Sequence, residues 1–191
     1  MFTAKFSTSI LLAALPILAQ AGQTVGAREL AAEMVQKLGV ALKQEIATNG
    51  PDGAVAACRD MAPLIAGELS RKSGARVARV SLKPRNPLLG DPDAWEQRVL
   101  TEFDRRAAAG EALESIDFSE TIDEPQGRYF RYMKALPVQP VCLTCHGSAE
   151  NIPAQVKARL ASEYPHDRAT GYALGQIRGA ITIKQPLDAS N

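Results

Sequence analysis

The sequence predicts an α+β fold, in which an N-terminal helical segment precedes an antiparallel sheet flanked by helices. Apolar residues recur at helical spacing through most of residues 27–74, and alternating segments separated by turn signals follow after residue 111. Apolar residues make up 46% of the chain, which is enough for a normal core. The length fits a single domain once a predicted leader is removed.

The first helix is predicted over Ala27–Thr48, where apolar residues recur at near-helical spacing, and Asn49-Gly50-Pro51 ends the pattern. A second helix follows and ends just before Gly74, and Pro63 inside it is expected to kink or divide it. The apolar face of the second helix comprises Val55, Cys58, Met61, Ala62, Ile65 and Leu69.

Ala75–Leu82 is predicted to be a strand, and residues 83–87 a proline-rich loop that cannot continue a strand ladder. A third helix is predicted over Asp91–Ala109. Its inward face should carry Trp95, Val99, Leu100 and Phe103.

Two further strands are predicted over Ala112–Ile122 and Arg128–Leu136, joined by a turn at residues 124–127. A short helix near Pro153–Ser162 and a glycine-rich loop precede a last strand over Gly179–Pro186. Helices first and antiparallel strands later are typical of the α+β class.

The N-terminus has the pattern of a secretory signal peptide. Met1–Lys5 is short and positive, Ile10–Leu18 is apolar but short for a membrane span, and Ala19-Gln20-Ala21 fits a cleavage site. We therefore expect cleavage after Ala21, export to the periplasm and a single domain over residues 22–191. A retained anchor helix is the alternative.

The charge balance gives no basis for binding nucleic acid or an anionic membrane. The chain has 22 Lys and Arg against 21 Asp and Glu, a net charge of +1. Removal of residues 1–21 takes away only Lys5, so the mature balance is 22 − 1 − 21 = 0. A nucleic-acid-binding face would need clustered basic residues. No other apolar run approaches the length of a membrane span, so no membrane insertion is expected after cleavage.

The run Cys142-Leu143-Thr144-Cys145-His146 has the C-x-x-C-H spacing of c-type haem attachment. The two thiols can form thioethers to one porphyrin, and the following histidine can be the proximal iron ligand. The alternatives are a thiol–disulfide redox pair, a zinc site, or a plain disulfide or two idle thiols. A redox pair would normally sit in a thioredoxin-like βαβ pattern, and a zinc site needs four ligands.

Cys58 is a third cysteine, and an odd cysteine in an exported protein needs a reason. It can be a small buried apolar residue, a partner in a mixed disulfide with Cys142 or Cys145, or a thiolate ligand to iron. The other candidates for a sixth iron ligand are weaker. They are His166, which is expected in an exposed turn, and the methionines Met34, Met61 and Met133, which are expected in the core.

The chain resembles a family of exported bacterial domains that carry a single c-type haem on a PAS-like fold, some of them sensor domains of histidine kinases. The matching segments are Ala57-Cys58, Ala62-Pro63, residues 80–87, Ala94-Trp95-Glu96, residues 142–147, residues 169–172, Gly175 and Ile177-Arg178-Gly179. The resemblance implies one covalent haem c, attached through Cys142 and Cys145. It also implies His146 and a distal cysteine as axial ligands, and that cysteine maps to Cys58.

Lys83, Arg85 and Arg178 are candidates to meet the two haem propionates, because cations offset the desolvation of partly buried carboxylates. Ordinary surface charge is the alternative for all three. Tyr129 and Tyr132 fall on opposite faces of a predicted strand, so at most one is expected to touch haem. The charged run at residues 104–106 is expected to be a solvated helix face.

We expect a haem-binding protein that senses redox state or a small ligand such as a gas. A low-potential electron-transfer cytochrome c is the alternative, since a thiolate ligand lowers the reduction potential. A peroxidase-like enzyme would need an open iron face, and filled axial sites argue against it, so the chain is not predicted to be an enzyme. The expected partners are the haem-c maturation machinery and another redox or signalling protein.

Overall fold

The computed structural model describes residues 14–187. Most of the predicted signal peptide therefore lies outside the described residues, as do the last four residues of the predicted domain, 188–191. Cleavage after Ala21 stays a prediction. Within residues 14–187, no helix combines the length and the apolar character that crossing a membrane requires.

A four-stranded antiparallel sheet forms the centre of the fold, in the order β1-β4-β3-β2. The strands are β1 (Arg76–Val80), β2 (Asp117–Glu124), β3 (Gly127–Pro137) and β4 (Ile177–Pro186). The predicted α+β class is confirmed. The closer likeness to PAS domains stays a prediction.

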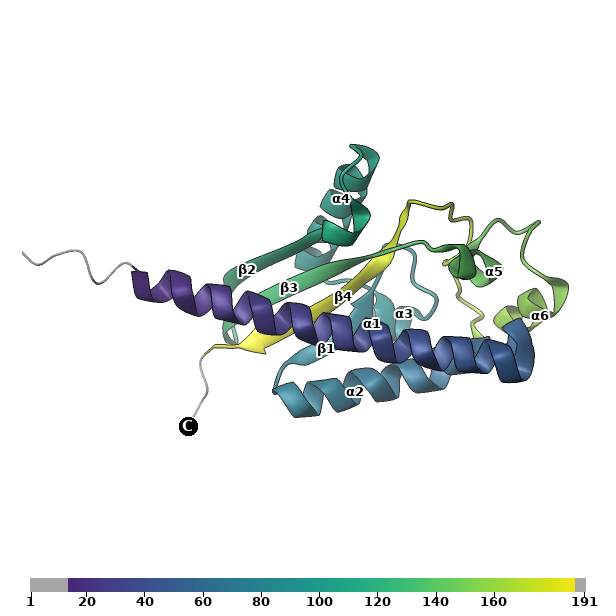
Figure 1. Cartoon of the computed structure of the whole chain (residues 1–191), viewed down its shortest axis with the longest axis horizontal. Helices are drawn as coiled ribbons and strands as arrows, with labels where there is room; N and C mark the ends of the chain where they lie inside the picture. The colour runs from purple at the N-terminus through teal and green to yellow at the C-terminus, as the bar shows by residue number, and fades with distance from the viewer. Residues whose placement is uncertain (1–13, 188–191) are drawn as a thin grey trace, which may run out of the picture.

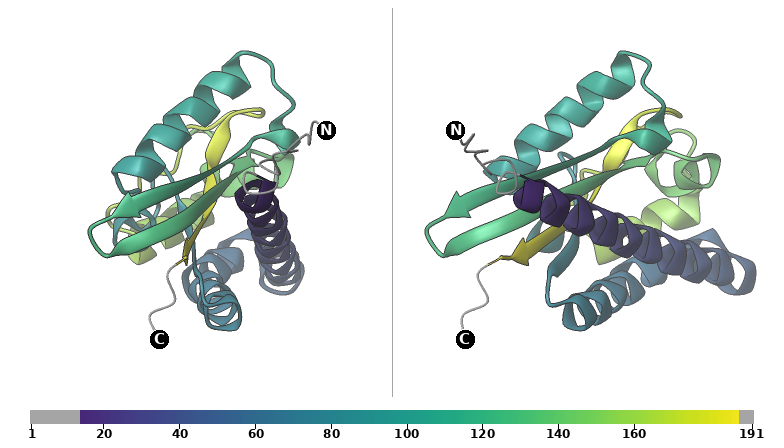
Figure 2. Two further views of the ribbon diagram at one scale, coloured as in Figure 1. Left: turned by 90° about the vertical axis from the view of Figure 1, so that its left-hand side faces the viewer. Right: turned by 60° about the vertical axis from the view of Figure 1, so that its left-hand side comes forward.

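Helices cover both faces of this sheet (Figures 1 and 2). The long α1 (Ala14–Ala56) and α2 (Ala62–Ser73) pack on one face, where alternate strand residues such as Phe130 and Ile181 are buried. The other face packs on α4 (Ala94–Ala108), with Met133 and Ala180 buried there. The period-two alternation of the central strands thus supplies one core on each side.

The ends of these elements differ from the predicted ones for local reasons. α4 begins at Ala94 because the Asp93 side chain accepts the Glu96 backbone N–H at 2.8 Å in a capping box. Residues predicted to open a strand at 112 form a 3₁₀ turn, η2 (Leu113–Ser115), so β2 starts only at Asp117. β4 starts earlier than predicted because Ile177 pairs with Pro137 across a register shift.

Three further short helical segments were not predicted. Pro87 and the Asn86 side chain, which accepts the Leu88 N–H, open α3 (Pro87–Gly90) right after the predicted loop. η3 (Pro140–Cys142) and α5 (Leu143–His146) together carry the C-x-x-C-H run. They lie with α6 (Ala154–Glu163) at the end of the sheet where β3 finishes (Figure 1).

The first two predicted helices are confirmed, but they are joined rather than separated. α1 bends at Gly50, whose φ of 76° lies in the left-handed region, and the chain resumes its helix at Pro51. A five-residue π turn, η1 (Ala57–Met61), then connects α1 to α2. Pro63 lies at the start of α2 and lacks the N–H that an α-helix would use there, which accounts for the irregular turn just before it.

The α4 face of the sheet contains a buried ion pair. The side chains of Arg131 and Glu96 are 2% and 1% exposed, and Arg131 Nη2 lies 3.1 Å from Glu96 Oε1. Thr182 donates a hydrogen bond to the same oxygen at 2.8 Å, and Arg131 lies over the Trp95 ring. Glu96 therefore helps to compensate a cation that is removed from water, together with Asp93 at 2.7 Å and Glu124 at 3.5 Å.

We expect Glu96→Ala to lower the free energy of unfolding by about 1–3 kcal/mol, because it removes the buried acceptor that Arg131 and Thr182 share, although Asp93 still pairs with Arg131. Urea denaturation followed by circular dichroism measures this change. Glu102→Ala is the matched control on the same helix, since Glu102 forms only an exposed pair with Arg105. Equal losses in the two variants would show that the buried pair contributes no more to the free energy of unfolding than the exposed pair does.

Candidate functional site

The C-x-x-C-H run occupies a tight helical turn after β3. Cys142 ends η3, and Cys145 and His146 lie on the single turn of α5. Gly147 must be a glycine, because a Cβ there would lie only 2.6 Å from the Leu143 carbonyl oxygen. All three cysteines of the protein are free thiols and half-buried in this structure.

His146 is fixed by a backbone acceptor. Its Nδ1 lies 2.6 Å from the Ala169 carbonyl oxygen, which can only accept, so the proton belongs on Nδ1 and the lone pair on Nε2. Burial lowers the pKa of His146 well below its usual range, and the nearby cations Arg178 and Arg85 lower it further. The ring is therefore neutral near pH 7. Arg178 Nε lies 3.2 Å from Nδ1 and 3.5 Å from Nε2, so the Nε2 lone pair, which a metal would use, accepts only a long hydrogen bond from this arginine.

Arg85 connects the C-x-x-C-H turn to the later loop at residues 167–169, and both segments orient His146. Its Nη2 donates to the Cys145 carbonyl oxygen at 2.5 Å, and its Nε donates to Asp167 Oδ2 at 3.1 Å. Asp167 in turn accepts the Ala169 N–H at 2.7 Å. The Arg85 side chain is only 9% exposed, so these bonds are shielded from water. They fix the Ala169 carbonyl where it meets His146.

A cavity of about 440 Å³ opens beside this turn. Cys58, His146, Arg85 and Arg178 all line it, although they come from distant parts of the chain. The rest of the lining is mostly apolar or small, for example Met34, Ala62, Val77, Val80 and Leu136. The cavity therefore joins one thiol and one imidazole in a largely apolar space that cations border.

Cys58 lies within the π turn η1, the irregular segment between α1 and α2. Burial raises the pKa of the Cys145 thiol, Arg85 opposes this rise, and the nearby Cys58 and Cys142 thiols add to it. Burial raises the pKa of Tyr164 to about 12, and the Cys58 thiol adds to that rise as well. These mutual effects show that Cys58 lies near both the C-x-x-C-H turn and the Tyr164 hydroxyl. Wide turns of this kind often occur at functional sites.

The remaining candidate residues divide into those that line the cavity and those that do not. Lys83 is outside the lining: its Nζ donates to the Thr170 carbonyl oxygen and lies 4.4 Å from the centre of the Tyr172 ring. His166 is exposed and outside the lining, as expected for a turn. Tyr129 and Tyr132 do not line the cavity either.

The three methionines also differ in burial and in whether they line the cavity. Met34 is buried and lines the cavity, while Met133 is buried in the core on the α4 side of the sheet. Met61 is 42% exposed and does not line the cavity, so it is not the core residue that the sequence predicted. It turns outward because the π turn shifts its position relative to the regular helical face.

Arg79 and Tyr164 also line the cavity, and the sequence analysis did not single them out. One signal for Arg79 was available. It occupies the same face of the predicted strand as Ala75 and Val77, which are both buried. A cation on the inward face of a strand indicates an anion to be bound. Tyr164 had no comparable signal, because it follows α6 in an irregular segment.

The donor set of the cavity fits a c-type haem. His146 presents a neutral Nε2 with its other nitrogen held by a carbonyl, which is the usual arrangement of a metal-binding histidine. Cys58 supplies a thiol to the same cavity, and Cys142 and Cys145 lie on the adjoining turn. Apolar and cationic lining residues match an apolar ring that carries two carboxylates.

Comparison with known proteins gives one family and one solved structure. The Tll0287-like family matches residues 17–186. The crystal structure of the cyanobacterial heme-protein Tll0287 superimposes with a TM-score of 0.64 at 27% sequence identity, covering 91% of this chain and 98% of that chain. None of the curated proteins matches the chain. Because the family match extends over almost the whole sequence, the protein belongs to the Tll0287-like family.

Proposed function

We propose that this chain is an exported c-type haem protein, and that it senses redox state or a small ligand through a His/Cys-ligated haem in the periplasm. One haem c is attached by thioethers to Cys142 and Cys145. His146 is the proximal iron ligand and Cys58 the distal one. The solved relative is described as a heme-protein, which supports the choice of cofactor.

The observation that carries this proposal is the shared cavity of Cys58 and His146. A spare thiol and an imidazole whose Nε2 carries the lone pair reach one largely apolar cavity, next to the turn that holds the two other thiols. A buried structural cysteine would not need an imidazole in the same cavity, and the three thiols are unpaired in this structure, which supports a ligand role for Cys58. When bound, haem supplies a one-electron iron couple and a site for diatomic ligands.

The chain's own residues determine the properties of the site. The Ala169 carbonyl holds the Nδ1 proton of His146 and keeps the ring in one orientation. Cys58 can serve as a thiolate ligand, since coordination to a metal deprotonates a thiol. A thiolate donates electron density strongly and favours a low reduction potential.

The position of Cys58 supports a sensing role. The π turn that carries it connects α1 to α2, and both helices pack on the same face of the sheet. A shift of Cys58 is therefore transmitted to two helices rather than absorbed in a loop. Such a protein passes its signal to another protein, and it acts as a receptor rather than as an enzyme.

Electron transfer is the second candidate. The cavity offers two donor side chains, one for each axial position, and a carrier keeps both positions filled while only the iron valence changes. In that case the partner is a redox protein. In either case the haem-c maturation machinery forms the thioethers.

The first prediction concerns attachment. Protein exported in a host that has haem-c maturation should carry haem that survives denaturation and acid–acetone extraction, because thioethers are covalent. Intact-mass spectrometry measures the added haem. Replacing Cys142 and Cys145 together by Ala should abolish the added mass, whereas Cys58→Ala should retain it. A matured wild-type protein without added haem would refute the proposal.

The second prediction concerns the distal ligand. Oxidised protein should have a low-spin spectrum with thiolate charge-transfer bands. Cys58→Ala should lose these bands, become high-spin or water-ligated, and have a higher reduction potential. Cys58→Met should regain six-coordinate haem at a higher potential than the wild type, because a thioether is the weaker donor.

His166→Ala is the matched control for this prediction, since His166 is exposed and outside the cavity. It should leave the spectrum and the potential unchanged. If Cys58→Ala had no effect while His166→Ala or Met34→Leu changed the spectrum, the distal ligand would have to be reassigned to that residue.

The third prediction separates a sensor from a carrier. In a sensor, reduction weakens the Cys58–iron bond, because ferrous iron binds thiolate less well, and CO then gains access to the haem. A CO titration of the reduced protein, followed by absorbance, should show a saturable spectral change. An unchanged spectrum at saturating CO would favour the electron-transfer function instead.

A further inference from the structure

The cavity is lined by an excess of positive charge. Five arginines contribute to its wall, and among the described residues no aspartate or glutamate does. These arginines are Arg59, Arg76, Arg79, Arg85 and Arg178. The positive charge of each must be balanced, because an unpaired charge in a partly apolar cavity is costly.

Three of the five arginines have carboxylate partners within the protein. Arg59 pairs with both Asp60 and Glu163. Arg76 Nη1 lies 3.1 Å from Glu96 Oε1. Arg85 pairs with Asp167 as described above. The charges of these three guanidinium groups are therefore neutralised without a ligand.

Arg178 has only neutral partners among the described residues. Its Nη1 donates to Ser81 Oγ at 2.9 Å and to the Lys83 carbonyl oxygen at 3.3 Å. Its Nε faces the neutral His146 ring, 3.2 Å from Nδ1 and 3.5 Å from Nε2. Its guanidinium also lies 5.4 Å from the centre of the Tyr172 ring. These contacts fix the side chain at the cavity wall but leave its charge unbalanced.

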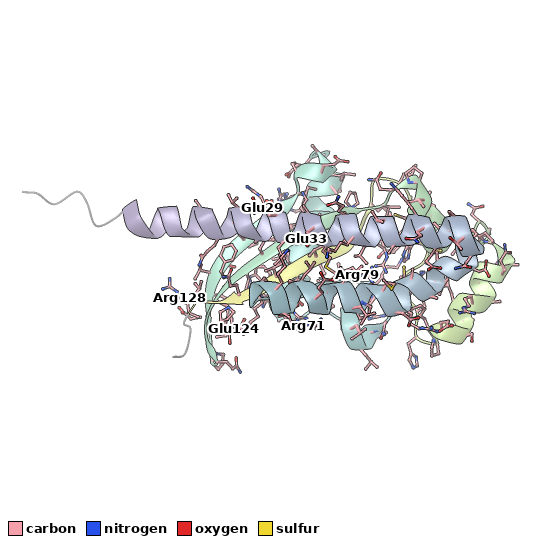
Figure 3. The ribbon with its side chains drawn as sticks, turned by 60° about the horizontal axis from the view of Figure 1, so that its bottom comes forward. Glu29, Glu33, Arg71, Arg79, Glu124 and Arg128 are labelled. Atoms are coloured by element: carbon pink, nitrogen blue, oxygen red, sulfur yellow. The ribbon has the colours of Figure 1, made fainter. Side chains whose placement is uncertain are left out.

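The side chain of Arg79 has no hydrogen bond or ion pair with any residue in the described range 14–187, although its backbone pairs with β4 opposite Ile181. It is half-buried on β1, and Figure 3 shows it between the ribbons of α1 and α2. It acts electrostatically on His146, Tyr164 and Arg178, three other members of the cavity wall, so its guanidinium lies close to them.

The backbone brings Arg79 and Arg178 to one end of the sheet. They lie on the neighbouring antiparallel strands β1 and β4, whose pairing runs from Arg76 opposite Lys184 to Val80 opposite Ala180. Gly179 allows the strands to close there, because a Cβ at that position would lie 2.4 Å from the Val80 carbonyl oxygen. Two unbalanced cations therefore border one cavity.

We propose that Arg79 and Arg178 bind the two propionate carboxylates of the haem, one each. The assignment rests on the proposed function, and it matches two unpaired guanidinium groups to the two negative charges that haem carries at its edge. Arginine suits this task because its planar donors match a carboxylate. Arg85 is then a positioning residue for the C-x-x-C-H turn, and Lys83 lies outside the set.

The first test uses the matured holoprotein. Arg79→Gln should retain covalent haem by intact mass but lower the reduction potential, because the lost cation favoured the more negative reduced haem. Arg79→Lys should restore much of the shift. Arg98→Gln, which removes an equal charge from an exposed site on α4, should change the potential far less. Equal shifts in Arg79→Gln and Arg98→Gln would overturn the assignment of Arg79.

The second test isolates the carboxylates. The full-length chain with Cys142 and Cys145 replaced by Ala is titrated with ferric protohaem and with its dimethyl ester, which lacks the charges. Arg79→Gln and Arg178→Gln should each weaken binding of protohaem about tenfold to a hundredfold, as the loss of a charge-assisted hydrogen bond does. Binding of the ester should not change.

The outcomes separate the two proposals. If the matured wild-type protein carries no haem, the proposed function fails. If it carries haem, and the arginine variants weaken protohaem and ester equally, the guanidinium groups act only through packing and the propionate assignment fails. If the chain without thioethers binds neither compound, the potential shift and its rescue by Lys decide the assignment.

Discussion

The arrangement of the site depends on one buried guanidinium. Arg85 binds the Cys145 carbonyl on the C-x-x-C-H turn and the Asp167 carboxylate on the later loop. Through Asp167 it also fixes Ala169, whose carbonyl determines the tautomer of His146. The ion pair is shielded from water, so removing one partner would leave a buried charge uncompensated. This single side chain therefore couples the position of the C-x-x-C-H turn to the orientation of His146.

The sheet contributes residues to the site mainly from its edge strand β1 and the neighbouring strand β4. β1 and β4 meet closely at Gly179, and this contact positions cavity residues from both strands. The opposite face of the sheet is stabilised by the buried pair of Arg131 and Glu96 under α4, and Glu96 also pairs with Arg76 in the cavity wall. The cavity is therefore connected to α4 as well as to α1 and α2, whose residues Met34 and Ala62 line it.

The position of Cys58 in the site depends on the irregular connection between α1 and α2. Gly50 bends the first helix, and Pro63 prevents a regular helix from running through η1. Cys58 lies between these two points, on a turn that departs from α-helical geometry. A regular helix would place its thiol differently relative to the cavity.

The sequence by itself determined the α+β class, the main helices and strands, an interruption of the helical pattern at residues 49–51 and the motif at residues 142–146, because these are encoded in local spacing. It also singled out Cys58 as a third cysteine that the C-x-x-C-H motif does not include. Only the tertiary structure decided that Cys58 and His146 share a cavity, that Ala169 orients the imidazole, and that Arg79 rather than Lys83 borders the site. Those contacts join residues far apart in the chain, and they depend on strand register and helix packing, which no local pattern specifies.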